Sequence, residues 1–80
     1  MDQNQIYERL TDIFRDVFDD ESISIEAETT AADIEDWDSL SHIMLLSAAE
    51  DEFGVKFDMK AVQELKNVGE MVALIETMLQ

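Results

Sequence analysis

The chain has 80 residues, of which 46% are hydrophobic, and a formal net charge of −15. A chain of this length forms one small domain, here residues 1–80, and its apolar fraction suffices for a core, so wholesale disorder is not expected. Thirteen acidic residues and no Lys or Arg lie between Arg15 and Lys56. Such a polyanion repels phosphate backbones and anionic lipids, which argues against nucleic-acid binding and favours partners with basic patches.

The sequence also lacks the signals of membrane insertion and export. No stretch approaches the roughly 18 apolar residues of a membrane-spanning helix, and the acidic N-terminus fits no secretory or import signal. There is no cysteine, which excludes disulfides and thiolate metal sites. We therefore expect a cytoplasmic monomer without membrane insertion.

The first residues predict an amphipathic helix over 4–18, because apolar side chains recur at helical spacing. This core stripe consists of Ile6, Leu10, Ile13, Phe14 and Val17. Residues 19–37 have no helical period and predict a long ordered loop, a feature that is usually functional in so small a domain. We expect four of its apolar residues to reach the core: Ile23, Ile25, Ala31 and Ile34.

The second half of the chain predicts two further helices and one short one. A helix from about Ser39 to Phe53 ends at Gly54, a typical left-handed terminator. The segment "MKAVQEL", with Asp58 as a possible cap, offers a turn or two of helix. Asn67 and Glu70 form a capping-box-like start to the last helix, whose core stripe is Val68, Val72, Ile75 and Leu79, with Met71 alongside. The expected fold is all-α, a bundle of three to four helices with a long loop between helices one and two.

The predicted helix 39–53 has one apolar stripe more than a core requires. Its core face comprises Leu45, Leu46, Ala49 and Phe53, with His42 among them. A second stripe, Leu40, Ile43 and Met44, lies roughly opposite and is flanked by Glu50 and Asp51. An exposed apolar strip edged with charge indicates a docking surface; the alternative is that the long loop covers it.

Two catalytic or metal-binding interpretations of "DSLSH" fail on context. Ser39, His42 and Asp38 could suggest a hydrolase triad, but the sequence has no G-x-S-x-G elbow and no evident oxyanion hole. We expect His42 to be a core-edge histidine, satisfied by a local backbone or carboxylate group. A calcium loop starting at Asp33 would need Gly and Glu where Asp38 and Met44 stand. We therefore predict no catalytic residues and no metal site.

Ser39 can then be a helix cap or a modified residue, and these two roles are compatible. Asp38 could cap the helix by itself, which would leave the serine hydroxyl pointing outward. A phosphodiester on that hydroxyl would sit at the positive end of the helix dipole. This position favours a phosphate-type modification without identifying it.

D-S-L at a helix start, followed by "SHIMLLSAAEDEFGVKF", resembles the acyl carrier and peptidyl carrier protein family. The resemblance runs from Ile6 to the terminal "NVGEMVALIETML". It implies that a phosphopantetheinyl transferase esterifies Ser39 with 4′-phosphopantetheine from coenzyme A, with Asp38 and Leu40 completing the attachment motif. The thiol of that group would hold acyl groups as thioesters, which supplies sulfur chemistry to a protein without cysteine and without catalysis of its own.

The resemblance also makes the second helix a recognition surface for enzymes that load and transfer acyl groups. The residues implied to face partners are Leu40, Ile43, Met44, Ser47, Glu50 and Asp51.

Three residues depart from the family pattern. Asp36 stands where many members have Gly, Met44 replaces a frequent acidic residue, and Trp37 is not typical of fatty-acid carriers. Trp37 is either a core aromatic or a flank of the prosthetic arm. These departures suggest a dedicated carrier for a specialised pathway, with fatty-acid-like and polyketide biosynthesis also open. The alternatives are a peptidyl or aminoacyl carrier, and an acidic helical adaptor in which Ser39 is merely a cap.

Overall fold

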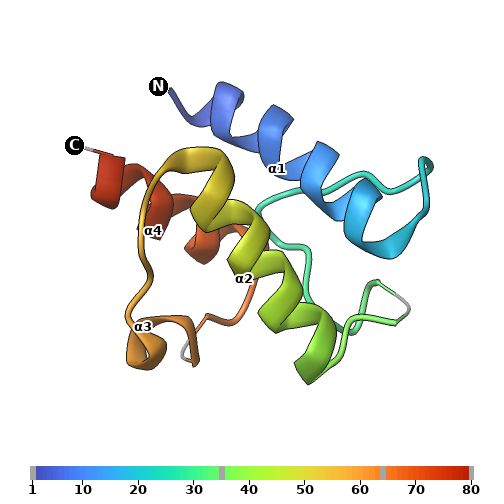
Figure 1. The fold of residues 1–80 in the computed structure, drawn as a ribbon. Helices are drawn as coiled ribbons and strands as arrows, with labels where there is room; N and C mark the ends of the chain where they lie inside the picture. Colours follow the sequence, from blue (N-terminus) through green and yellow to red (C-terminus); the bar gives the residue numbers. More distant parts are fainter. Residues whose placement is uncertain (1, 35, 64, 80) are drawn as a thin grey trace.

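The computed structural model describes residues 2–34, 36–63 and 65–79, with the side chains of Met59 and Gln63 excepted. Its four helices are α1 (Gln3–Phe18), α2 (Ser39–Phe53), α3 (Met59–Gln63) and α4 (Val68–Leu79) (Figure 1). Within these residues the secondary structure is helical and contains no strand. The all-α prediction is confirmed, and the first helix begins one residue earlier than its apolar period indicates.

Local capping explains where the helices begin and end. The Asp2 side chain accepts the Gln5 N–H, and the Gln5 side chain accepts the Asp2 N–H. These two bonds form a capping box that starts α1. Gly54 ends α2 with φ 66°, the left-handed conformation that glycine adopts without steric cost. At the predicted start of α4, the Asn67 Oδ1 accepts the Glu70 N–H at 2.9 Å. Asp58 likewise accepts the Lys60 N–H at 2.9 Å, at the start of α3.

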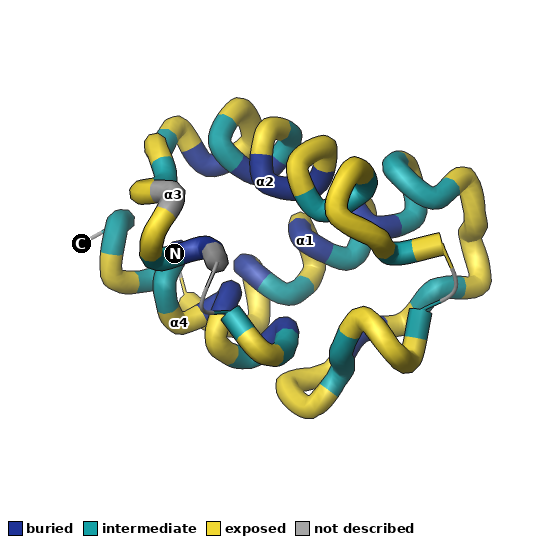
Figure 2. The backbone as a smooth tube through the Cα atoms, turned by 90° about the horizontal axis from the view of Figure 1, so that it is seen from below, coloured by how far each residue is buried: buried dark blue, intermediate teal, exposed yellow. Residues whose placement is uncertain are grey.

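The core lies where α1 packs against both α2 and α4. Figure 2 shows the buried parts of these helices turned toward one another. Most of the predicted stripe residues are buried, and Val17 and Leu79 lie partly buried at its edge. The largest side chains with no or almost no exposed surface are Ile6, Leu10, Phe14, Leu45, Val68, Met71, Val72 and Ile75.

Backbone contacts hold the long loop between α1 and α2 against α4. The Val68 N–H donates to the Thr29 carbonyl at 2.8 Å, and the Gly69 N–H donates to the Ala27 carbonyl at 2.9 Å. The loop therefore satisfies N–H groups that the first turn of α4 leaves free. Gly69 permits this approach, since a Cβ there would lie 3.0 Å from the Ala27 oxygen.

The apolar residues of the loop follow the prediction with one exception. Ile25 is buried, and Ile23 and Ile34 pack partly buried against the core. The expectation that Ala31 reaches the core is wrong, because Ala31 is exposed. It lies inside a turn in which the Asp33 N–H donates to the Thr30 carbonyl at 2.9 Å, and this turn keeps Ala31 out of the core.

Candidate functional site

Asp38, and not Ser39, caps the N-terminus of α2. Its backbone is extended (φ −121°), and its Oδ1 accepts the Ser41 N–H at 3.0 Å. This hydrogen bond from the Ser41 backbone lowers the pKa of the Asp38 carboxyl below its ordinary value. Ser39 is the first residue of the helix and is exposed. Its hydroxyl is therefore not required for capping.

The turn before α2 is fixed by a residue in an unusual conformation. Asp36 has a φ of 72°, in the left-handed region that residues other than glycine seldom adopt. The Ser41 hydroxyl donates to the Asp36 carbonyl at 2.7 Å and thereby ties this turn to the helix. The position where the family resemblance leads us to expect Gly thus has the backbone conformation that Gly favours.

The second apolar stripe of α2 lies on the surface. Leu40, Ile43 and Met44 are 69%, 57% and 48% exposed, so the loop does not cover them. We call these three residues the docking strip, after the role that the sequence predicts for them. Ser47 and Asp51 are exposed as well and continue the same face along the helix.

Glu50 is placed differently from its neighbour Asp51. It is partly buried, and its Oε2 accepts the Phe57 N–H at 2.8 Å, which ties α2 to the segment before α3. Glu52 is paired with Arg9 of α1 at 3.0 Å. Of these three carboxylates, Asp51 is therefore the one without a structural bond among the described residues.

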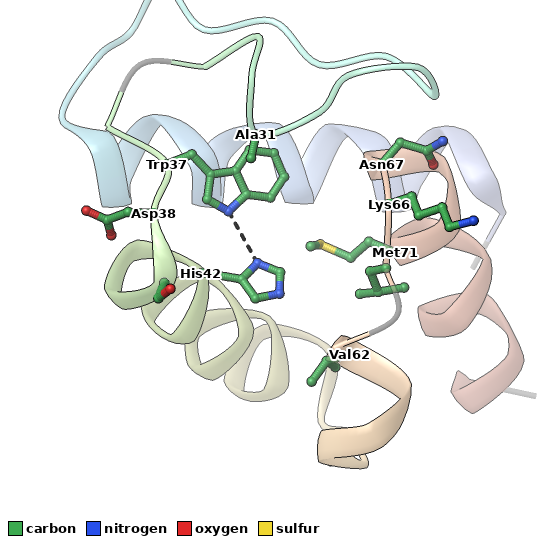
Figure 3. Close-up of a pocket in the computed structure, with 10 residues that line it drawn as sticks. Ala31, Trp37, Asp38, His42, Val62, Lys66, Asn67 and Met71 are labelled. Atoms are coloured by element: carbon green, nitrogen blue, oxygen red, sulfur yellow. Dashed lines mark hydrogen bonds between the residues drawn. The ribbon is translucent and has the colours of Figure 1, made fainter.

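A cavity of about 350 Å³ opens beside Ser39, between the start of α2, α3 and the start of α4 (Figure 3). Its wall contains the apolar side chains of Val62, Leu65 and Met71, together with Trp37 and His42. Its volume is in the range of about 300–1,000 Å³ that small-molecule sites occupy in proteins. Ser39 thus borders both the solvent and a cavity.

Trp37 and His42 form a pair on the wall of this cavity. The indole Nε1–H donates to His42 Nδ1 at 3.2 Å, and the two rings stack with centroids 5.9 Å apart. The hydrogen-bond partner of His42 is therefore Trp37. Our prediction of a local backbone or carboxylate partner is wrong. Trp37 also meets Phe14 edge-to-face at 5.2 Å, so it both packs on the core and flanks the cavity. Sequence spacing gives no signal for this pair.

Among the described residues, the site offers an accessible hydroxyl for esterification, and Ser39, His42 and Asp38 do not form a hydrogen-bonded triad. His42 Nδ1 already accepts from Trp37, and the Asp38 carboxylate is committed to the helix cap. The described residues contain no group of three or more His, Cys, Asp or Glu placed to hold a metal ion. An exposed primary alcohol at the positive end of a helix dipole fits a phosphodiester-linked prosthetic group.

Comparison with known proteins agrees with the family resemblance that the sequence shows. The family described as phosphopantetheine attachment site matches residues 8–75. The chain is 27% identical over 77 residues to an acyl carrier protein of Lactobacillus acidophilus, covering 96% of each sequence. It also matches the solution NMR structure of a holo acyl carrier protein from Geobacter metallireducens, with a TM-score of 0.86, 46% identity, and 91% of this chain and 84% of that chain covered.

The chain therefore belongs to the phosphopantetheine-binding family and is an acyl carrier protein, a non-catalytic carrier to which phosphopantetheine is covalently attached. Proteins of this kind interact with the enzymes that modify them and handle their acyl groups. Among the described helices, none combines the length and apolar character needed to cross a membrane.

Proposed function

We propose that Ser39 is the residue that carries 4′-phosphopantetheine, within one carrier domain spanning residues 1–80. The observation that carries this proposal is the exposed Ser39 at the first position of α2, with the capping role taken by Asp38. Transfer from coenzyme A would form the Ser39 Oγ–phosphorus bond and break the phosphoanhydride of coenzyme A, releasing adenosine 3′,5′-bisphosphate and the proton of the serine hydroxyl. When bound, the group supplies a terminal thiol on which acyl groups are held as thioesters.

The neighbouring residues prepare Ser39 for this modification. Asp38 holds the first turn of α2 in place, and Ser41 ties that turn to Asp36 at 2.7 Å. The hydroxyl is thus presented on an ordered helix end, whose dipole favours the negative charge of a phosphodiester. Leu40, next to Ser39, begins the docking strip.

We propose that enzyme partners bind the docking strip together with Ser47 and Asp51. These partners are a phosphopantetheinyl transferase and the enzymes that load and transfer acyl groups. Exposed apolar side chains act as anchors, and the surrounding carboxylates attract basic patches on the partner. Glu50 also lies on this side of α2, but its bond to Phe57 gives it a structural role.

The pathway we propose is a specialised one, related to fatty-acid or polyketide biosynthesis. Three features support a dedicated carrier: Asp36 keeps a left-handed turn without glycine, Met44 adds an exposed apolar group to the docking strip, and Trp37 lines the cavity beside Ser39. Each changes a surface that a partner or a tethered group would meet.

The test of this proposal is intact mass after incubation with a transferase and coenzyme A. The wild-type protein and Ser24→Ala, which alters an exposed loop serine, should each gain one phosphopantetheine. Ser39→Ala should gain none and should remain folded, because Ser39 is exposed and does not cap α2. Loading of Ser39→Ala to the wild-type extent would show that another residue is the attachment point.

A further inference from the structure

The pair of Trp37 and His42 fixes which nitrogen of the histidine carries a proton. An indole nitrogen only donates hydrogen bonds, so Nδ1 of His42 must accept the bond of 3.2 Å. In the neutral imidazole the proton is then on Nε2. This second nitrogen is a hydrogen-bond donor on the side of the ring away from Trp37.

The donor faces the cavity beside Ser39. Figure 3 shows the imidazole projecting from α2 toward the space bordered by Met71 and Val62, on the opposite side from its bond to Trp37. Within the described part of the chain, Nε2 has no hydrogen-bond partner, although its ring is partly buried. The cavity wall therefore carries an oriented donor, His42 Nε2–H, beside the apolar side chains of Val62, Leu65 and Met71.

The other polar groups of the cavity wall have different roles. Asn67 Oδ1 accepts the Glu70 N–H, and Asp38 Oδ1 accepts the Ser41 N–H. The Lys66 ammonium is directed away from the cavity in Figure 3. His42 Nε2 is thus a donor of the cavity wall whose orientation is fixed by the bond between Nδ1 and Trp37.

We propose that His42 is a specificity-determining residue that selects acyl chains bearing an oxygen acceptor, such as a 3-hydroxyl or 3-oxo group, over plain saturated chains. This inference rests on the proposed attachment at Ser39, which borders the cavity, so that the flexible arm can fold back and bring its acyl chain into the cavity. A saturated chain that displaces water leaves the Nε2–H unpaired, whereas an oxygenated chain gives it an acceptor. Binding sites discriminate strongly when the wrong ligand leaves a polar group of the protein unpaired.

The experiment compares two acyl groups that differ by one hydroxyl. Wild-type protein is loaded from octanoyl- and 3-hydroxyoctanoyl-coenzyme A, and intact mass confirms each product. The rate of thioester cleavage by hydroxylamine is then measured, relative to the corresponding free acyl-pantetheine. We expect the protein to protect the hydroxylated chain about two- to tenfold more than the saturated chain, the effect of one neutral hydrogen bond.

Two variants test the residues involved. His42→Phe keeps a ring but removes the donor, and it should abolish the difference between the two chains. Trp37→Phe keeps His42 but removes the indole N–H that orients its tautomer, and it should reduce the difference. Because the sequence has a single histidine, the Nε2–H resonance of the wild type gives a measurement without substitution. That signal should sharpen and shift with the hydroxylated chain only.

Three results would overturn the proposal: equal protection of both chains in the wild type, a difference that survives in His42→Phe, or no protection of either chain. Failure of the proposed attachment would appear separately, as the absence of any mass increase that depends on Ser39.

Discussion

The carboxylate of Asp38 accepts the backbone N–H of Ser41 at 3.0 Å, and this bond closes the first turn of α2 around Ser39. Because the cap is an acid, it responds to pH, whereas a serine cap would not. The same bond is the largest cause of the lowered pKa of Asp38.

The first prediction follows from the sign of that shift. A carboxyl whose pKa is lower in the folded state stabilises the fold above its unfolded pKa, and this contribution is lost as pH falls through the folded pKa. At neutral pH the wild type should have a higher free energy of unfolding than Asp38→Ala. This difference should narrow below pH 3.8, the ordinary pKa of an aspartate carboxyl. Asp38→Asn provides a neutral cap, so the difference in free energy of unfolding between Asp38→Asn and Asp38→Ala should not change with pH. Urea unfolding at several pH values measures both differences. If the difference between the wild type and Asp38→Ala did not change with pH, the role of the carboxylate would be contradicted.

The second prediction concerns Asp36, which has a φ of 72°. Replacement by Gly, Asn or Ala removes the same charge in each case, so the three variants can be compared directly. Gly and Asn adopt left-handed angles more readily than Ala, and we expect both to be more stable than Asp36→Ala by about 1 kcal/mol. Thermal unfolding provides the comparison. Equal stability of all three variants would show that the left-handed turn is not maintained in solution.

The third prediction separates the docking strip from the core by a matched pair of substitutions. Ile75 has no exposed surface, and Ile75→Ala should cost about 2–5 kcal/mol, the usual range for a buried isoleucine. Ile43 is 57% exposed, and Ile43→Ala should cost far less. Ile43→Ala should nevertheless slow loading by the transferase. The folded fraction of Ile75→Ala should be loaded at the wild-type rate, because that substitution changes stability and not the docking strip. If the two substitutions were equally destabilising, Ile43 would belong to the core.

The fourth prediction concerns the carboxylates of α2. Asp51→Lys should slow transferase loading mainly at low salt, because rim charges act on association rate and are screened by salt. Glu8→Lys makes the same change at an exposed position of α1 and should have a smaller effect. Glu50→Lys should also lower stability, since it removes the acceptor of the Phe57 N–H. Equal loading rates for Asp51→Lys and Glu8→Lys would place the recognition surface elsewhere.

The sequence predicts the helices well because their signals are local. The spacing of Ile6, Leu10 and Phe14 defines the buried face of α1, and Gly54 and Asn67 mark helix ends through their own backbone or side-chain bonds. The exposed docking strip is predictable for the same reason, since α2 has apolar residues on two opposite faces.

The remaining features depend on the path of the long loop, which no periodicity encodes. The turn that exposes Ala31 and the pairing of Trp37 with His42 both arise from how this loop returns to α2. The bond between Glu50 and Phe57 similarly depends on the segment that follows Gly54. Sequence patterns identify Glu50 as charged and near the strip, but only the folded chain shows which carboxylate is already bonded.

The central claim is that Ser39 is the attachment residue, and site-resolved mass spectrometry of the loaded protein tests it most directly. Cleavage before aspartate releases residues 38–50, a peptide containing Ser39, Ser41 and Ser47. The Ser41 hydroxyl is bonded to Asp36, and Ser47 lies two turns further along α2, so only Ser39 combines exposure with the helix start. Fragmentation of this peptide should place the whole phosphopantetheine mass on Ser39. Its appearance on Ser41, on Ser47 or outside this peptide would contradict the account.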